Sequence, residues 1–333
     1  MDLDLLQQTL AARGEPAFRA RQVWEWTARG VEDYAAMTNL PGALRAALAE
    51  EVPFSCLTVQ RQARSRDGTV KALFATADGR PLEAVLMRYR DRGGSICLSS
   101  QSGCPLTCTF CATGRMSFAR NLSASEIVEQ ALHFRRLAGP GAFGHCVFMG
   151  MGEPLLNLDA VLAACERLPE VGIAHRHTAI STVGWIPGIE RLTRSELPLR
   201  LALSLHAADE ALRSELMPVN ERHPLRDVIE ACRAFYARRR RRIFVEYVML
   251  AGVNDRYEQA LALARLLDRR MFKVNLIPYN PTDSPYRGSG REAIAAFAAV
   301  LRERGLETTV RLTRGRDIDA ACGQLAARAT AAA

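Results

Sequence analysis

Three cysteines lie within eight residues of one another, in the segment CPLTCTFC, as Cys104, Cys108 and Cys111. Their spacing is C-x3-C-x2-C, and Phe110 precedes the last of them. A structural zinc site with four cysteines usually shows two C-x2-C pairs, and the sequence has no second pair. Tight cysteine loops of this kind hold iron–sulfur clusters. We therefore predict that the three thiolates bind three irons of a [4Fe–4S] cluster and leave the fourth iron open to a small molecule; zinc binding or simple burial is the alternative.

Two other cysteines lie where their thiols could react. Cys97 is in SICLSS, seven residues before Cys104, and Cys322 is in RGRDIDAACGQL, close to the C-terminus and surrounded by charge. The cysteines in apolar segments, which we predict to be inert, are Cys56, Cys146, Cys165 and Cys232. Nine cysteines in a chain without a secretory signal argue for metal or redox chemistry rather than for a disulfide framework.

The composition is that of an ordinary globular protein. Of 333 residues, 48% are hydrophobic and 24% are charged, and no apolar run approaches transmembrane length. The N-terminus, MDLDLLQQTL, lacks the basic and apolar regions of a signal peptide, so we predict a cytoplasmic protein without a membrane partner. The net charge of +8 suits a nucleic-acid partner. The densest basic segment, 238–242, is either an RNA-phosphate contact or a solvated helix end.

The periodicity of apolar residues divides the chain at about residue 90. Residues 1–52 show helical spacing, with Gly14 at the end of the first segment. Residues 55–88 show short alternating runs separated by Asp-Gly turns, which is typical of a β-meander. We predict that residues 1–90 form a small accessory, RNA-binding region of helices and a meander, and that residues 91–333 form the main domain.

In the main domain, strand and helix patterns alternate. The predicted strands are SICLSS, HCVFMG, HTAIST, LRLALSL, RIFVEYVML, FKVNLIP and ETTVRLT. Helical segments between them include SASEIVEQALHFRRLA, LDAVLAACERL, LRDVIEACRAFYARR, RYEQALALARLLDRR and REAIAAFAAVLRERG. Such alternation predicts an α/β fold with a parallel sheet, and six consecutive units suit a partial (β/α) barrel. Reactive groups then gather at the carboxyl ends of the strands.

Each predicted strand runs into a polar or glycine-rich motif at that end. After the second strand, in MGMGEPLLN, Gly150 and Gly152 would let backbone approach a ligand, and Glu153 would meet an ammonium group. Later strands add further polar groups, Ser181, Ser204, His206 and Asn280. Any one of these could be an ordinary strand-end cap, but together they predict a polar cavity.

The motifs together resemble one family. They are CLSSQSGCPLTCTFCATG, FMGMGEPLLN, AISTVGWIPGI, LALSLHAADEALRSELMPVN, EYVMLAGVND, VNLIPYNP and RGRDIDAACGQL, with FRARQVWEW and SRDGTVKALF in the accessory region. The chain resembles, over nearly its whole length, the radical S-adenosylmethionine (SAM) RNA adenine methyltransferases that modify carbon 2 of adenine. The resemblance implies a monomer that acts on 23S rRNA and tRNA and takes electrons from a donor such as flavodoxin. It implies SAM contacts from Gly152, Glu153, Ser181, Ser204, Leu205, His206 and Asn280.

The resemblance also implies a mechanism that uses two SAM molecules per turnover. Cys322 takes a methyl group from one SAM and becomes S-methylcysteine. A second SAM, held on the open iron, yields a 5′-deoxyadenosyl radical that removes hydrogen from that methyl group. The carbon adds to adenine, and Cys97 then attacks the sulfur of Cys322, which releases the RNA and leaves a disulfide. Glu83, in PLEAVLMRY, matches the proton acceptor, although the loop before it is one residue longer than the family pattern.

Three alternatives remain. The nearest is a relative that methylates carbon 8 of adenine and confers antibiotic resistance; EYVML and TRGRDIDAACGQL resemble the carbon-2 group more closely. A non-catalytic iron–sulfur RNA-binding protein would need neither Cys97 nor Cys322. A radical SAM activase or maturase would share the three clustered cysteines but lack DAACGQL.

Overall fold

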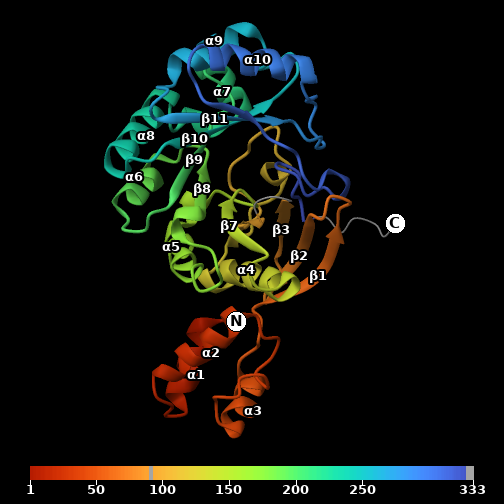
Figure 1. The fold of residues 1–333 in the computed structure, drawn as a ribbon, viewed down its shortest axis with the longest axis vertical. Helices are drawn as coiled ribbons and strands as arrows, with labels where there is room; N and C mark the ends of the chain where they lie inside the picture. Colours follow the sequence, from red (N-terminus) through yellow and green to blue (C-terminus); the bar gives the residue numbers. More distant parts are fainter. Residues whose placement is uncertain (90–92, 328–333) are drawn as a thin grey trace.

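The computed structural model describes residues 1–89 and 93–327, and its backbone is built around one mixed sheet (Figure 1). The ten strands run in the order β1-β2-β3-β4-β7-β8-β9-β10-β11-β12. From β4 onward all neighbours are parallel. These parallel strands are β4 (Gly93–Cys97), β7 (Phe143–Phe148), β8 (Thr178–Thr182), β9 (Arg200–Ser204), β10 (Ile243–Met249), β11 (Phe272–Pro278) and β12 (Thr308–Val310). The predicted α/β partial barrel is confirmed, with all seven predicted strands in it.

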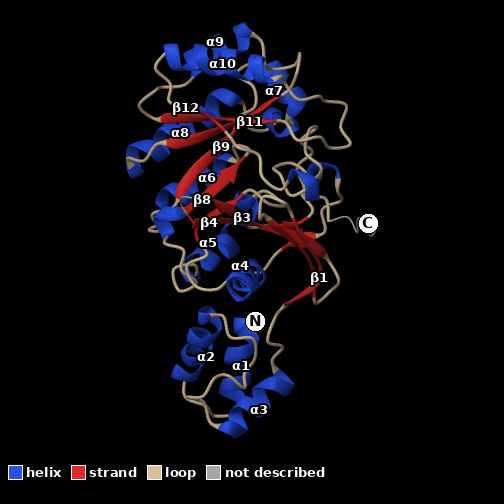
Figure 2. Cartoon of the chain, turned by 45° about the vertical axis from the view of Figure 1, so that its right-hand side comes forward, coloured by secondary structure: helices blue, strands red, loops and turns tan. Residues whose placement is uncertain are grey.

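Helices connect the parallel strands, and all but the one at Glu210–Leu216, which packs beside the cysteine loop, cover the outer side of the sheet (Figure 2). They are α4 (Ala124–Ala138), α5 (Leu158–Arg167), α6 (Ile186–Arg194), α7 (Glu210–Leu216), α8 (Leu225–Arg239), α9 (Tyr257–Leu266) and α10 (Arg291–Glu303). A capping box begins α4, in which the Ser123 hydroxyl accepts from the Glu126 N–H and the Glu126 carboxylate accepts in return. Nowhere in 1–89 or 93–327 is a helix long and apolar enough to cross a membrane.

The predicted meander extends the same sheet. Strands β1 (Leu57–Arg64), β2 (Val70–Thr76) and β3 (Pro81–Tyr89) pair antiparallel, and β3 pairs with β4 so that Val85 lies opposite Cys97. Buried residues of the meander, such as Phe74 and Leu82, belong to the same core as the barrel. The boundary predicted at residue 90 lies in 90–92, outside the described residues. Packing groups the meander with the barrel rather than with the helices that precede it.

The first three helices form a separate lobe at the lower end of Figure 1. These are α1 (Leu3–Ala12), α2 (Phe18–Arg29) and α3 (Gly42–Glu51), and their buried residues make a small core of their own, including Leu6, Met37 and Leu48. The lobe contacts the barrel through both charge and packing. The amino group of Met1 and the guanidinium of Arg136 both pair with the buried carboxylate of Glu129 on α4, and Trp24 and Ala28 on α2 belong to the main core.

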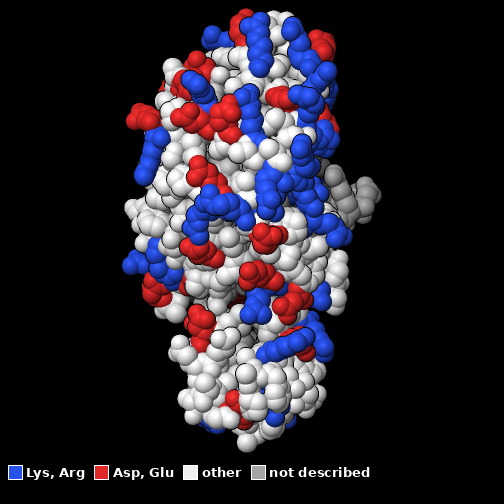
Figure 3. All heavy atoms as spheres, turned by 90° about the vertical axis from the view of Figure 1, so that its left-hand side faces the viewer, with Lys and Arg blue, Asp and Glu red and all other residues white. Residues whose placement is uncertain are grey.

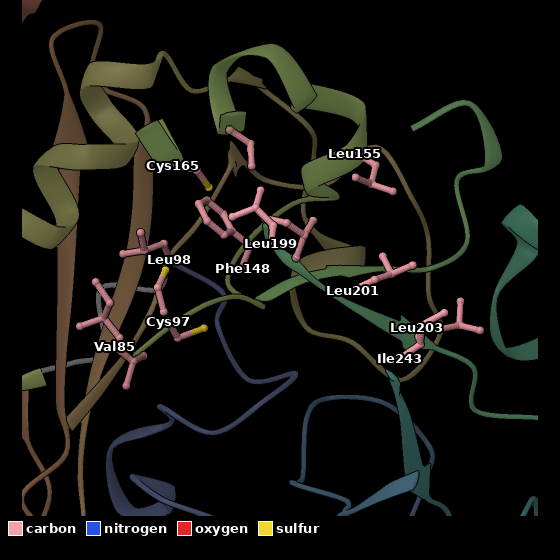
Figure 4. Close-up of a cluster of buried hydrophobic side chains, with 14 of the residues drawn as sticks. Val85, Cys97, Leu98, Phe148, Leu155, Cys165, Leu199, Leu201, Leu203 and Ile243 are labelled. Carbon is pink, nitrogen blue, oxygen red and sulfur yellow. The ribbon is translucent and has the colours of Figure 1, made fainter. Parts of the chain in front are cut away.

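The main core lies between the parallel strands and their helices. All five residues of β8 are buried, as are Leu201 and Leu203 on β9, which is the pattern of strands covered on both faces. Figure 4 shows Cys165 on α5 beside Phe148 on β7 within this packing. Burial of large apolar side chains on both faces fixes the register of the strands, and therefore the positions of the residues that follow their carboxyl ends.

The arginine-rich segment 238–242 lies at the amino ends of the parallel strands. It joins the end of α8 to the start of β10, so it adjoins the amino ends of the strands. The guanidinium groups of Arg239 and Arg241 donate to the carbonyls of Leu192 and Pro198, and Arg242 pairs with Glu307 at 2.7 Å. On the face in Figure 3, basic and acidic side chains alternate over the barrel rather than forming one continuous basic patch. The arginines of this segment therefore make local contacts, and they lie away from the carboxyl ends of the strands.

Candidate active site

The loop with the three clustered cysteines follows β4 and is tightly folded. The N–H of Cys111 donates to the carbonyl of Cys108 at 3.2 Å, and the N–H of Thr109 donates to Leu216 at 3.0 Å. A Cβ on Gly114 would lie 2.9 Å from the Cys108 carbonyl oxygen, so only glycine fits at that position. The loop thus lies at the carboxyl end of β4, as the strand order requires.

The three thiols influence one another. Burial raises the pKa of Cys104 to about 12 and that of Cys108 well above its usual value, and the neighbouring thiolates raise the pKa of Cys108 further. Ionising all three adjacent thiols therefore costs free energy unless a cation is bound to them. Among the described residues no three His, Cys, Asp or Glu are placed to hold one metal ion, but in an iron–sulfur cluster each thiolate binds its own iron. Soft sulfur donors around a shared space fit such a cluster.

A cavity of about 760 Å³, open to solvent, lies beside the cysteine loop. Its lining includes seven residues that the sequence brings from the loop, the strand ends and the C-terminal segment: Cys111, Gly152, Glu153, Ser181, Ser204, His206 and Cys322. The structure therefore brings together most of the residues predicted to bind SAM.

Glu153 is a buried carboxylate at this cavity. Its two oxygens accept from the N–H groups of Leu155 at 3.1 Å and Val183 at 3.0 Å, which fixes the side chain. Burial raises the pKa of Glu153 to about 7, although these hydrogen bonds oppose the shift. Gln101, which sequence reasoning missed, accepts from the Glu153 N–H at 2.8 Å. The carboxylate is thus positioned to accept a hydrogen bond from a bound amino group.

The other predicted contacts are hydrogen-bonded in part. The hydroxyls of Ser181 and Ser204 lie 3.3 Å apart, each able to turn toward a ligand. His206 has a φ of +59°, and its Nδ1 accepts from the N–H of Val248 at 3.0 Å, which places the proton on Nε2. Burial lowers the pKa of His206 to about 3, so the ring is neutral. Leu205 is different, because its side chain is fully buried in the core and does not line the cavity.

A second cavity, of about 470 Å³, contains both of the other predicted reactive cysteines. Cys97 and Cys322 line it together, and Cys322 also lines the first cavity. Asn280 lies here rather than in the first cavity; its Nδ2 donates to the Cys322 carbonyl at 3.1 Å, and its Oδ1 is buried without a partner. One thiol therefore borders both the predicted ligand cavity and the space that holds the second thiol.

A cation that sequence reasoning missed faces these thiols. Arg311 lines the second cavity. The negative charge of a Cys322 thiolate contributes most to raising the pKa of the Arg311 guanidinium. Burial raises the pKa of Cys97 to about 12, and Arg311 acts against that rise. Arg213 is a comparable case near Cys108, fully buried with its guanidinium donating to the Val183 carbonyl at 2.6 Å. Neither arginine stands out in a sequence whose basic residues are nearly all arginine.

Glu83, the predicted proton acceptor, lines a third cavity of about 660 Å³. It lies on β3, two residues before Val85, so its side chain is on the face of the sheet that Cys97 shares. Its carboxylate is buried, pairs with Lys71 at 3.0 Å, and accepts from the N–H groups of Ala326 at 3.0 Å and Ala327 at 3.1 Å. The pairing joins β2 and β3 to the segment that carries Cys322.

Comparison with known proteins agrees with this arrangement. Residues 98–264 match the Radical SAM superfamily, and residues 1–53 match the ribosomal RNA large subunit methyltransferase N-terminal domain. The crystal structure of a radical SAM methyltransferase from Sphaerobacter thermophilus superposes with a TM-score of 0.92 at 44% identity, over 98% of both chains. The fold and the cysteine loop thus define a radical SAM protein, whose class implies a [4Fe–4S] cluster and SAM.

Full-length relatives narrow the class further. A probable dual-specificity RNA methyltransferase RlmN of Chloroflexus aurantiacus is 47% identical over 98% of this chain and 92% of its own. The dual-specificity RNA methyltransferase RlmN of an Anaeromyxobacter species is 46% identical over 98% of this chain and 89% of its own. The chain belongs to the RlmN family of radical SAM methyltransferases, which confirms the predicted family.

Proposed function

We propose that the chain methylates carbon 2 of an adenosine in 23S rRNA and in tRNA and uses two SAM molecules for each methyl group. The names of its full-length relatives support a dual-specificity RNA methyltransferase, and the N-terminal match supports ribosomal RNA. The observation that carries the proposal is that Cys322 borders both the cavity of Glu153 and the cavity of Cys97. A thiol in that position can take up a methyl group in the first cavity and can be attacked by Cys97 in the second.

In this proposal the cysteine loop and the first cavity hold the cofactors. Cys104, Cys108 and Cys111 would bind three irons, and Glu153 would accept a hydrogen bond from the amino group of SAM. The hydroxyls of Ser181 and Ser204 would contact its polar part. When bound, the cluster and SAM would supply the radical chemistry that an electron-poor carbon requires. The residues that line this cavity would orient SAM.

Cys322 would act as a nucleophile. Its thiolate attacks the methyl carbon of a SAM sulfonium, so that a sulfur–carbon bond forms and a neutral thioether leaves. The carbon on Cys322 later bonds to the adenine ring, which joins protein and RNA. Arg311 lines the same cavity as Cys322 and Cys97, and its charge opposes the rise in the pKa of Cys97.

Cys97 would resolve this adduct. Its thiolate attacks the sulfur of Cys322, a disulfide forms, and the bond between that sulfur and the carbon breaks. Glu83 would take the proton from the adenine ring; its Oε2 accepts from Ala326 and Ala327, whereas its Oε1 pairs with Lys71 and can also accept that proton. A flavodoxin-type donor would return electrons to the cluster and reduce the disulfide, and we expect a single chain to be sufficient for activity.

The proposal is tested with Cys322→Ala, with Cys56→Ala as a matched control because Cys56 is a half-buried thiol that lines none of the three cavities. In cells that lack the native gene, we expect Cys56→Ala to restore 2-methyladenosine in 23S rRNA and Cys322→Ala to restore none, although both bind iron. Chromatography of digested RNA separates the methyladenosine isomers. Full activity of Cys322→Ala, or 8-methyladenosine as the product, would contradict the proposal. RNA binding without any methylation by the unaltered chain would favour a non-catalytic role.

A further inference from the structure

We infer that the turn between β1 and β2 positions Cys322. We call the contacts between turn residues 65–69 and loop residues 314–319 the anchor. The inference deepens the proposed function, because it takes from that proposal only the role of Cys322. In sequence the two segments are about 250 residues apart, and they meet beside the barrel opening.

The anchor is built from two aspartates that point in opposite directions across the contact. From the loop, the carboxylate of Asp317 accepts from the Ser65 hydroxyl at 2.5 Å and from the Arg66 N–H at 3.1 Å. From the turn, the carboxylate of Asp67 accepts from the Gly315 N–H at 3.0 Å. Each side therefore supplies a carboxylate to a backbone N–H of the other, and charge-assisted bonds of this kind are among the stronger ones.

Close packing supports the same contact. Gly315 has a φ of +64°, and a Cβ there would lie 2.7 Å from the Cβ of Ala320 and 2.8 Å from Cγ2 of Thr69. The guanidinium of Arg314 lies 5.4 Å from the ring centre of Tyr89 on β3. The loop is thus folded closely against β2 and β3 and is not merely tethered to them.

The Lys71 ammonium donates to the Asp319 carbonyl at 3.1 Å, which adds a contact on the anchor side of Cys322. A second set of contacts holds the other side of Cys322. The N–H of Ala112, beside the cysteine loop, donates to the Gly323 carbonyl at 2.8 Å, and the Thr113 hydroxyl donates to the Leu325 carbonyl at 2.6 Å. Cys322 lies between the two sets, in a segment that is fixed at both ends.

This arrangement matters because Cys322 borders two cavities with different partners. A free loop would distribute the thiol over many positions, and its effective concentration at either partner would fall. The anchor removes that freedom before any ligand binds. Ser65, Asp67 and Asp317 are therefore positioning residues, which act on the chemistry only through Cys322.

The test measures how strongly the loop presents Cys322 to Cys97. Full-length protein with reconstituted cluster is equilibrated anaerobically in glutathione redox buffers. Mass spectrometry of linked peptides then gives the fraction with a Cys97–Cys322 disulfide. The equilibrium constant relative to glutathione is the effective concentration of the two thiols. We expect Asp317→Ala to lower it about tenfold, the factor of one hydrogen bond to a charged group.

Two variants control the measurement. Asp227→Ala removes an exposed aspartate in the first turn of α8, away from the loop, and should leave the constant unchanged. Ser65→Ala removes the partner hydroxyl, and its effect should largely disappear in the Asp317→Ala background because both changes break the same bond. Trypsin should also cleave after Arg316 faster in Ser65→Ala than in Asp227→Ala, because Ser65→Ala loosens the anchor without changing the residues at the cleavage site.

An unchanged constant in Asp317→Ala would overturn the inference, as would equal losses in Asp227→Ala. If the cluster is absent from the preparation, the two thiols still report on the anchor. The result does not depend on methyl transfer: if Cys322 never carries a methyl group, the proposed function fails while the loss of effective concentration in Asp317→Ala still supports the anchor.

Discussion

Gly152 offers a sharp test of how the cavity is built, through the substitution Gly152→Ala. Its φ is +94°, and a Cβ there would lie 2.5 Å from Cβ of Gln101 and 2.6 Å from its Oε1. Gln101 is not free to move, because its Oε1 accepts from the Glu153 N–H and its Nε2 donates to Asn121. The added methyl group must therefore displace a side chain that holds the backbone of Glu153.

The magnitude follows from two costs. A left-handed backbone costs an alanine about 1–2 kcal/mol. Breaking the hydrogen bonds of buried Gln101 adds about 1–3 kcal/mol. Gly172 is the matched control, because its φ is +100° and a Cβ there meets nothing within 4 Å. We expect Gly152→Ala to lower the free energy of unfolding by about 2–5 kcal/mol, and Gly172→Ala to lower it only by the first cost, about 1–2 kcal/mol.

Urea unfolding of the two variants and the unaltered protein measures this difference, and SAM binding by the cluster-loaded protein measures its effect on the site. We expect SAM binding to weaken in Gly152→Ala and to remain unchanged in Gly172→Ala. Equal losses of stability in both variants would show that Gln101 adjusts at no cost. Unaltered SAM binding in Gly152→Ala would refute the role given to this strand end.

Three further outcomes follow from the site. Burial raises the pKa of Glu153 from 4.5 to about 7, so the stability of the fold falls as the pH rises from about 5 to about 7 and the carboxyl group ionises. The advantage of Glu153→Gln in urea unfolding should therefore grow by about 2 kcal/mol over that range, and a flat difference would contradict the burial argument. Cys108→Ser should lose most bound iron after anaerobic reconstitution, which normally gives about four irons per chain, and full iron content would exclude Cys108 as a ligand. Cys97→Ala should remain bound to RNA even in denaturant, and adding Cys322→Ala to the same chain should abolish this bound RNA. Normal turnover of Cys97→Ala without trapped RNA would argue that Cys97 only packs.

Local pattern was sufficient to predict the strands and the cysteine loop. Strands such as β9 show short apolar runs, and the alternation of strand and helix patterns predicts a parallel sheet. Helix α6 was missed, because it begins at Ile186-Pro187, follows a Gly, and is only nine residues long. The predicted polar strand ends do meet, since parallel strands place their carboxyl ends at one edge.

The finer placement depends on tertiary contacts that local pattern does not contain. Asn280 was predicted in the SAM cavity, but the turn after β11 directs it to the Cys322 carbonyl in the second cavity. The side chain of Leu205 lies in the core. Side chains alternate along an extended backbone, and the neighbouring Ser204 faces the cavity. The Lys71–Glu83 pair and the contact between Asp317 and Ser65 join segments whose polar residues look like ordinary turns and strand faces.

The central claim is that the methyl group reaches RNA from Cys322 and not directly from SAM. Protein made in cells should already carry an unlabelled methyl group on Cys322, visible in the mass of its peptide. A single turnover with trideuteromethyl SAM and RNA tests the claim directly, because it asks which methyl group appears in the first product. We expect the first 2-methyladenosine formed to be free of the trideuteromethyl group and labelled product to appear only in later turnovers. A first product that carries the label from SAM would contradict the claim.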